Sequence, residues 1–393
     1  MASPLCLLSP TLCVTSNYIS KNGEKLKQVK NKEQLRVAII GLGAVTRNIH
    51  LPAYASLAKK IKVVGGCDPQ FEARKTAREK FGLKEVFDDP LKMIENTAPD
   101  IVSVCTPPSL HVEQTLMALE KGCYVFCEKP LAESLTDADK LIDAAANANR
   151  FVVVNNQFPY MNIHLAAKKM IGTPEFGRLL FLQAWQTFRP NEITEADWRG
   201  KLQKRLCFEF GIHVFSLARF FFDAEPIRVS AQMPNPLSKF NSDVLNFITL
   251  EFADGRAASI ILNRLSKAPE RYLEMRLDGE FASVHTSIGG EVRFEAGMHT
   301  REKRPFFGLN FIKGGKAVWQ DGNKSKLIAK DGINPFASST AHHLGNFIDA
   351  IRNGGVPPGT VADNKKTLAL VFAAYDSAQT QRSIKMSEYT NGR

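Results

Sequence analysis

The chain has 393 residues, of which 44% are hydrophobic and 23% are charged. This balance is typical of a globular protein, and the length predicts two domains with separate cores. The net charge is +11, but lysines and arginines are spread along the chain among acidic residues, so we expect no nucleic-acid partner. No stretch reaches the roughly 18 apolar residues of a membrane-spanning helix, and we expect no membrane association.

Two features of the sequence indicate the cellular compartment: the spacing of the cysteines and the composition of residues 1–34. The seven cysteines form neither a paired framework nor a zinc motif, which indicates free thiols in a reducing compartment. Residues 1–34 are rich in Ser, Thr and Leu and contain no acidic residue before Glu24. This N-terminal extension resembles an organellar transit segment, although it lacks Arg, and a disordered tail is the alternative. We expect a cytoplasmic protein, with a plastid location as the alternative.

Strand-like runs alternate with amphipathic stretches between residues 35 and 155. The runs are LRVAIIG, KVVGGCD, DIVSVCT, CYVFCEK and FVVVNN. Such alternation predicts parallel strands joined by helices, and runs that are apolar throughout indicate a sheet covered on both faces. We therefore predict an α/β protein whose residues 35–155 form a doubly wound Rossmann domain.

The first predicted strand ends in the glycine-rich loop GLGAVT. Gly41 permits a tight turn, and Gly43 lets the backbone approach a pyrophosphate at the following helix N-terminus. Thr46 replaces the third glycine of the usual fingerprint, which requires only slightly looser packing of helix on strand. We expect Gly41, Gly43, Ala44 and Thr46 to bind a dinucleotide, although a plain turn before a helix is the alternative for the motif alone.

Asp68 closes the second predicted strand, somewhat further along than the roughly 20 residues usual for the ribose-binding acid. Its carboxylate can accept both ribose hydroxyls of NAD and would repel the extra phosphate of NADP. NAD is therefore the preferred cofactor. Arg74, one helical turn on, keeps NADP open, and a simple Asp-Pro turn is the structural alternative.

The second part of the chain has a different pattern. Runs rich in Thr, Phe, Val and Ile are broken by turn residues, and FADGRA between two alternating runs predicts a hairpin. We assign residues 156–393 to an α+β domain with a large, mostly antiparallel open sheet for substrate binding and oligomerisation. Helices at 339–353 and 363–380 close the chain and can pack back on the first domain. Because an open sheet needs its exposed face covered, we expect a homodimer or homotetramer.

More specific motifs lie between these landmarks. They are TPPSLH at 106–111, KGCYVFCEKPLAESLTDADKL around Glu128, NIHLPAY after the glycine loop, and FIDAIRNG and LALVFAAYDSAQ near the end. Together they resemble the Gfo/Idh/MocA family of sugar and polyol dehydrogenases over roughly residues 35–388. The resemblance implies that Thr106, Pro107, His111 and Glu128 contribute to the cofactor site.

Lys129 follows the fifth predicted strand. The resemblance implies that this lysine reaches the substrate hydroxyl beside the nicotinamide, and open α/β sheets do bind ligands at the carboxyl ends of their strands. An ammonium group there would stabilise the alkoxide that develops as hydride departs. Pro130 favours a tight bend for which a cis peptide bond is an option, and an exposed lysine before a turn is the alternative.

The segment KRLCFEFGIHVFSLARFF resembles the family's helix with Asp, a three-residue spacer and His. Here Glu209 and His213 lie four residues apart, on one helical face. His213 is expected to be the general base, because its unperturbed pKa is nearest neutrality, and Glu209 is expected to orient it. Glu in place of Asp, and Ser216 where the family has a further Asp, leave the exact substrate open.

Arg199, in the Asp197-Trp198-Arg199 segment, and Tyr160, in FPYMN, are further candidates for substrate binding. His342-His343 lacks a third ligand at metal spacing, so we expect no metal. The leading hypothesis is an NAD(P)-dependent oxidoreductase that transfers hydride between a secondary hydroxyl of a sugar, polyol or inositol-like substrate and the nicotinamide. The alternative is a non-catalytic dinucleotide-binding regulator on the same fold.

Overall fold

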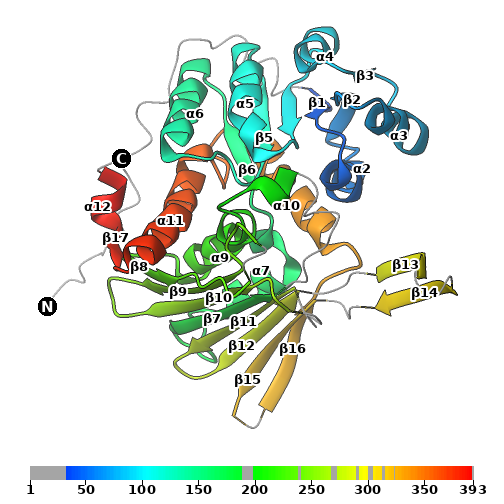
Figure 1. The fold of residues 1–393 in the computed structure, drawn as a ribbon. Helices are drawn as coiled ribbons and strands as arrows, with labels where there is room; N and C mark the ends of the chain where they lie inside the picture. Colours follow the sequence, from blue (N-terminus) through cyan, green and yellow to red (C-terminus); the bar gives the residue numbers. More distant parts are fainter. Residues whose placement is uncertain are drawn as a thin grey trace, which may run out of the picture.

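The computed structural model describes residues 32–187, 198–237, 240–266, 272–288, 292–299, 304–311, 315–322 and 324–391. The predicted targeting segment therefore lies almost entirely outside the described residues. Figure 1 shows two sheets at different levels of the molecule, with helices α9, α10 and α11 between them. None of the helices in the described residues has the length and apolarity that crossing a membrane requires.

The first sheet is parallel and confirms the predicted doubly wound fold. Its strands are β1 (Leu35–Ile40), β2 (Ile61–Cys67), β3 (Val86–Phe87), β4 (Ile101–Val104), β5 (Tyr124–Glu128) and β6 (Val152–Asn155), in the order β3-β2-β1-β4-β5-β6. Every residue of β4, β5 and β6 is buried, as expected for strands covered on both faces. The two residues of β3 are too few to produce a sequence pattern.

Helices connect these strands. They are η1 (Thr46–His50), α2 (Leu51–Ser56), α3 (Phe71–Phe81), α4 (Pro90–Thr97), η2 (Pro108–Leu110), α5 (His111–Glu120) and α6 (Leu135–Ala148). Side chains cap two of them, because Asp89 accepts from Lys92 N and Ser134 accepts from Asp137 N. Gly122, with φ of 76°, follows α5 closely, as is common where a helix ends.

Short helices link the two sheets. After β6 come η3 (Phe158–Tyr160) and α7 (Asn162–Met170), and after the first strand of the second sheet come η4 (Trp198–Lys201), the π-helix η5 (Leu206–Gly211) and α9 (Ile212–Phe222). The segment that carries Glu209 and His213 is therefore helical, as predicted. Its first part is π-helical, a conformation frequently found at functional sites.

The second sheet is large and mostly antiparallel, as predicted. Its strands are β7 (Leu179–Thr187), β8 (Arg228–Gln232), β9 (Leu245–Glu251), β10 (Ala257–Asn263), β11 (Leu273–Gly279), β12 (Ser283–Ile288), β15 (Lys316–Asp321), β16 (Lys324–Lys330) and β17 (Ile384–Lys385), in the order β16-β15-β12-β11-β7-β10-β9-β8-β17. The predicted hairpin is confirmed, since β9 and β10 pair antiparallel. Only β7 and β10 pair parallel among these strands. A separate two-stranded sheet joins β13 (Val292–His299) and β14 (Arg304–Phe311).

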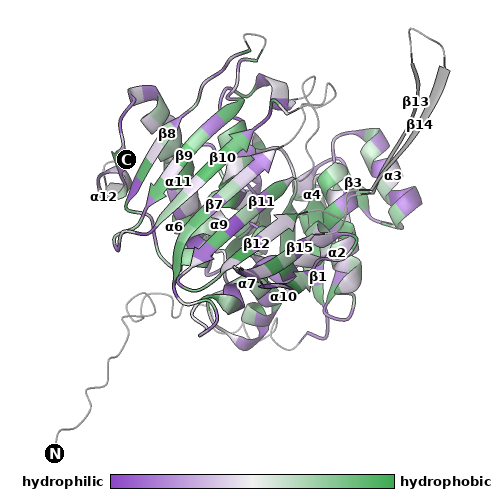
Figure 2. Ribbon diagram, turned by 90° about the horizontal axis from the view of Figure 1, so that it is seen from below, coloured by the Kyte–Doolittle hydropathy of each residue, from purple (hydrophilic) through white to green (hydrophobic). Residues whose placement is uncertain are grey.

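The two faces of the second sheet differ. Buried and exposed residues alternate along β9 and β10, and helices α7, α9 and α11 contact the sheet on one face. Large apolar side chains remain accessible elsewhere on its strands: Phe181 is 36% exposed, Trp185 52% and Phe247 41%. Figure 2, which views the molecule from the side of this sheet, shows apolar and polar positions alternating along the strands.

Three helices close the chain: α10 (Pro335–Asn353), α11 (Val361–Thr380) and α12 (Met386–Asn391). Helix α10 contacts η1, α2 and β6 of the first domain, where Phe347 stacks on Phe126. Helix α11 contacts α6 of the first domain as well as α9 and β8 of the second. The C-terminal helices therefore tie the two sheets together.

Candidate active site

A cavity of about 660 Å³ lies at the carboxyl edge of the first sheet. One side is formed by the glycine-rich loop and the ends of β2, β4 and β5, and the other by η4 and η5. The predicted site residues on its wall are Gly41, Gly43, Ala44, Asp68, Thr106, Pro107, Glu128, Lys129, Arg199 and Glu209. Thr46, His111, Tyr160 and His213 do not line it.

The glycine-rich loop can approach a ligand closely. Gly41 has φ of 92°, and a Cβ on it would lie 2.7 Å from Cys105 O, so only glycine fits. A Cβ on Gly43 would meet nothing within 4 Å, which leaves open space on that side. Thr46 is fully buried and donates from Oγ1 to Gly41 O at 2.5 Å. Thr46 therefore stabilises the turn from the buried side. The prediction that it binds the cofactor is wrong, because it does not line the cavity.

Asp68 joins the loop to β2. Its Oδ2 accepts from Leu42 N at 2.9 Å, and its Oδ1 accepts from Gln70 N at 2.9 Å. Arg74 donates from Nη1 to Asp68 O and Pro69 O, at 2.7 and 2.9 Å. The cavity wall thus presents the Asp68 carboxylate, whereas the Arg74 guanidinium is engaged by the backbone.

Two residues of the TPPSLH motif have different roles. Thr106 donates from Oγ1 to Gln114 Oε1 at 2.6 Å and lines the cavity. His111 is fully buried, with ring nitrogens 2.8 Å from Thr106 O and Pro130 O. Burial lowers the pKa of His111. The His111 ring therefore links the segments that follow β4 and β5 by hydrogen bonds. The expected contact of His111 with the cofactor is not supported, because the ring does not line the cavity.

Lys129 bridges the two sides of the cavity. Its peptide bond to Pro130 is cis. Its Nζ donates to Glu209 O at 2.8 Å and lies 5.8 Å from the centre of the Phe210 ring. Burial lowers the pKa of Lys129, even though the nearby Glu128 and Glu209 carboxylates oppose the shift. The amine is therefore held by the backbone of η5 at the edge of the cavity.

Sequence reasoning missed a buried polar chain behind Glu128. Glu128 Oε1 accepts from His50 Nε2 at 2.7 Å and from Asn155 Nδ2 at 2.8 Å. His50 Nδ1 lies 2.8 Å from the Tyr54 hydroxyl, which lies 2.5 Å from Ser103 Oγ. The available signal was the NIHLPAY segment, in which His50 and Tyr54 are four residues apart and so share a helical face.

Within this series of buried polar side chains, His50 and Glu128 form an ion pair. Burial lowers the pKa of His50, but its interactions with Cys105, Tyr54 and Glu128 outweigh burial and raise the pKa well above its usual value. Burial raises the pKa of Glu128, but the hydrogen bond and charge of His50 outweigh burial and lower it. Glu128 therefore presents a carboxylate whose position is fixed from behind by an imidazolium.

The Glu209 carboxylate faces two arginines. Arg199 donates from Nε to Oε1 at 3.1 Å, and Arg205 Nε lies 3.5 Å from Oε2. No hydrogen bond joins this carboxylate to His213 in the described part of the chain. The geometry therefore does not support the expected role of Glu209 in orienting His213. Glu209 pairs with the two arginines instead, because guanidinium charges attract a carboxylate more strongly than a neutral imidazole does. Arg199 also stacks on Trp198, with its guanidinium carbon 4.4 Å from the ring centre.

His213 lies on α9, next to the cavity but not on its wall. Its ring stacks on Phe158 at 3.9 Å between centres, with 8° between the planes. Its Nδ1 is buried without a hydrogen-bond partner. Burial, with a further contribution from the Lys129 charge, holds the pKa of His213 well below its usual value. The ring is therefore neutral near pH 7 and has a nitrogen lone pair to offer.

One predicted site residue, Tyr160, lies elsewhere. Tyr160 lines a separate cavity, where its ring stacks on His343 at 4.3 Å between centres. The structure therefore does not bring Tyr160 together with Lys129. Asp197, in the segment that also holds Trp198 and Arg199, lies outside the described residues.

Comparison with known proteins agrees with this architecture. Residues 35–156 match the model of an oxidoreductase family with an NAD-binding Rossmann fold, and residues 164–285 match that of the GFO/IDH/MocA C-terminal domain. The chain is 24% identical to a D-apiose dehydrogenase of Paraburkholderia graminis over 367 residues, which cover 90% of each protein. It is 23% identical to the myo-inositol 2-dehydrogenase of Thermotoga maritima over 369 residues, covering 90% of this chain and 99% of the relative.

Solved structures show the same fold. An oxidoreductase from Agrobacterium radiobacter, crystallised with NAD+, L-tartaric acid and magnesium, superposes with a TM-score of 0.74 at 19% identity. The superposition covers 91% of this chain and 99% of that one. With both family models matched in order along the chain, the protein belongs to the Gfo/Idh/MocA family of oxidoreductases with an NAD-binding Rossmann fold.

Proposed function

We propose that this protein catalyses the reversible oxidation of a secondary hydroxyl group on a sugar, polyol or inositol-like substrate. The supporting observation is that one cavity is lined by Gly43, Asp68 and Lys129. Open space beside Gly43 fits a pyrophosphate, and the Asp68 carboxylate fits the ribose hydroxyls. When bound, NAD supplies the acceptor for the hydride.

Lys129 stabilises the substrate oxygen in this proposal. Its ammonium group is held at the edge of the cavity by Glu209 O. Negative charge on the substrate oxygen grows as the carbon loses hydride, and a preorganised cation is most effective against such developing charge. The hydrogen bond to Glu209 O uses one of the three ammonium protons of Lys129, so the other two can contact the substrate.

We assign the role of proton acceptor to His213, which lies beside the cavity and behind its wall. Its lowered pKa keeps the ring neutral, and Nδ1 has no other partner. Phe158 holds the ring plane. Glu209 positions Arg199 on the cavity wall through their 3.1 Å hydrogen bond, and Arg199 binds a polar group of the substrate. Tyr160 has no part in this site, because it lines the separate cavity.

The substrate class rests on the named relatives, which act on D-apiose and on myo-inositol. Purified protein screened against sugars, polyols and their phosphates, with NADH absorbance as the readout, would identify the substrate. NAD is expected to serve better than NADP, because Asp68 lines the cavity while Arg74 is engaged by backbone carbonyls. Binding of NAD without turnover of any such substrate would favour the regulator over the enzyme.

Replacing Lys129 by Met tests the catalytic assignment. The substitution keeps much of the side-chain volume but removes the charge, so NAD affinity should stay nearly unchanged while kcat falls on the order of 10²- to 10³-fold. Titration calorimetry with NAD is the control for the fold and the cofactor site. Wild-type turnover in Lys129→Met would refute the role of the lysine.

We also propose that two or four copies assemble through the exposed apolar side chains of the second sheet, which include Phe181, Trp185 and Phe247. These side chains lie on β7 and β9, which flank β10 in the sheet, and exposed apolar patches of this kind commonly mark interfaces. Light scattering should give a dimer or tetramer, and Trp185→Asp should shift the population toward monomers. A monomeric wild-type protein would contradict this assembly.

The compartment is a further proposal, with cytoplasm favoured and plastid as the alternative. Five cysteines in the described residues are free thiols, namely Cys67, Cys105, Cys123, Cys127 and Cys207, which fits a reducing environment. A fluorescent fusion of residues 1–34 distinguishes the two, because a transit segment would carry the reporter into plastids.

A further inference from the structure

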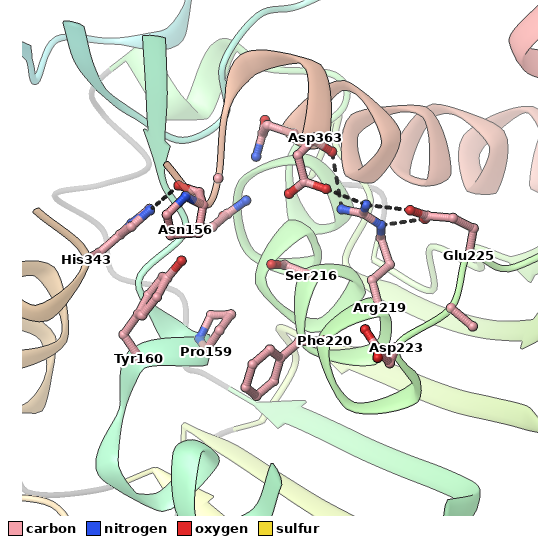
Figure 3. A pocket seen from close by; sticks show the side chains of 14 residues that line it. Asn156, Pro159, Tyr160, Ser216, Arg219, Phe220, Asp223, Glu225, His343 and Asp363 are labelled. Atoms are coloured by element: carbon pink, nitrogen blue, oxygen red, sulfur yellow. Dashed lines mark hydrogen bonds and ion pairs between the residues drawn. The ribbon is translucent and has the colours of Figure 1, made fainter. Parts of the chain in front are cut away.

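A second cavity of about 400 Å³ lies apart from the cofactor cavity (Figure 3). Its wall is built from the η3 segment after β6, the end of α9, helix α10, and the start of α11. The two cavities share no lining residue. The second cavity therefore lies where the C-terminal helices meet the connection between the two sheets.

Three buried polar atoms on this wall have no hydrogen-bond partner within the described part of the chain. They are Asn156 Oδ1, His343 Nδ1 and Asn364 Oδ1, and their residues are 6%, 1% and 2% exposed. Buried polar groups in proteins are nearly always hydrogen-bonded. Because the three come from different segments and line one cavity, they indicate a shared partner inside it.

His343 contributes an acceptor. Its Nε2 lies 3.2 Å from Pro358 O, so Nε2 carries the proton and Nδ1 keeps the lone pair. Burial lowers the pKa of His343 to about 4, and the ring is therefore neutral near pH 7. Its stacking on Tyr160 fixes the direction of Nδ1.

The charges on the wall argue against an anionic ligand. Among the described residues of the wall, Arg219 is the single cation, and Figure 3 shows it turned toward Glu225 and Asp363, with hydrogen bonds of 2.6 to 2.7 Å to their carboxylates. Asp223 adds a third carboxylate. Phosphates and nucleotides are therefore disfavoured.

The remaining groups fit hydroxyl groups. The three unpartnered atoms are all acceptors, which the hydroxyl groups of a ligand can satisfy by donating, and the Ser216 hydroxyl can both donate and accept. Pro159, Tyr160 and Phe220 supply apolar surface around the same space. A few convergent polar groups on a partly apolar wall are usual for small-molecule sites, and the volume lies in their range.

We propose that the second cavity binds a small neutral polyol or monosaccharide through Asn156, His343 and Asn364, independently of the cofactor cavity. The ligand would sit against the segment that holds the proposed base, because Pro159 lines the cavity and Phe158 stacks on His213. This ligand need not be the substrate.

Saturation-transfer NMR with myo-inositol and with D-glucose tests the proposal in the absence of NAD. Wild-type protein and Lys129→Met should bind one of these probes equally well, because Lys129 lies in the other cavity. Asn364→Leu replaces an amide whose buried Oδ1 has no partner by an apolar group of similar size and should fold normally. It should weaken probe binding about tenfold or more.

Ser216→Leu provides a second variant, because Ser216 is half-buried on the wall and a larger side chain there would fill the space. It should also abolish probe binding. Binding that is lost in Lys129→Met but kept in Asn364→Leu and Ser216→Leu would overturn the proposal in favour of the cofactor cavity. Absence of binding to the wild type, or a crystal soaked in both probes that shows only water in the second cavity, would overturn it as well.

Discussion

The two sides of the cofactor cavity are built differently. The strand wall, formed by Gly41, Gly43, Asp68, Glu128 and Lys129, follows strands of the first sheet. Its backbone is fixed by the pairing of neighbouring strands and by bonds between their ends, such as the one that Leu42 N donates to Asp68 Oδ2.

The helix wall, formed by Trp198, Arg199 and Glu209, lies on short helices. Ion pairs of Glu209 with Arg199 and Arg205 hold it together, and one hydrogen bond from Lys129 ties it to the strand wall. The comparison teaches that backbone conformation sets the cofactor side of the cavity, whereas side-chain charge sets the other side. Substitutions should separate the two.

The largest effect is expected on the strand wall, from Gly41→Ala. A positive φ and a Cβ placed 2.7 Å from Cys105 O should together destabilise the fold by roughly 2–6 kcal/mol. Gly43→Ala is the matched control, because its Cβ meets nothing: it should keep the stability and lose only cofactor affinity. Urea unfolding and NAD calorimetry measure both quantities, and equal stability of the two variants would contradict a wall set by backbone conformation.

A smaller effect is expected on the helix wall, from Glu209→Gln. The change removes a carboxylate that lies 3.5 Å from the buried Arg205, so the free energy of unfolding should fall by about 1–3 kcal/mol. Glu209→Asp keeps the charge and should lose less. Because the strand wall is untouched, NAD affinity should change little in either variant. A loss of NAD affinity as large as in Gly43→Ala would show that the two walls are not separable.

The smallest effect concerns the ion pair behind the strand wall. The raised pKa of His50 means that its stabilising charge is fully present below its unperturbed value of 6.5 and is lost as the pH rises through the raised value. The lowered pKa of Glu128 means that its contribution is lost only as the pH falls below about 4.5. The free energy of unfolding of the wild type should exceed that of His50→Gln at neutral pH, and this difference should shrink by about 1 kcal/mol at alkaline pH. Thermal melting at a series of pH values measures this difference, and a constant gap would show that His50 is not charged.

The sequence alone determined the framework of this protein. The apolar strands, the glycine-rich loop, Asp68 and the Glu128-Lys129-Pro130 segment were all predicted, because each depends on residues close together in the chain. The predicted hairpin between β9 and β10 was found for the same reason. The parallel pairing of β7 with β10 depends on strands far apart in sequence, and no local pattern indicates it.

Only the tertiary structure decided how the side chains are partnered. It turned Glu209 toward Arg199 and Arg205 and set His50 behind Glu128. It also places Tyr160 on the wall of the second cavity, which four separate segments of the chain form. The physical reason is that turns and strands follow from nearest neighbours in the chain, whereas the burial and electrostatics of a side chain depend on every element that packs around it.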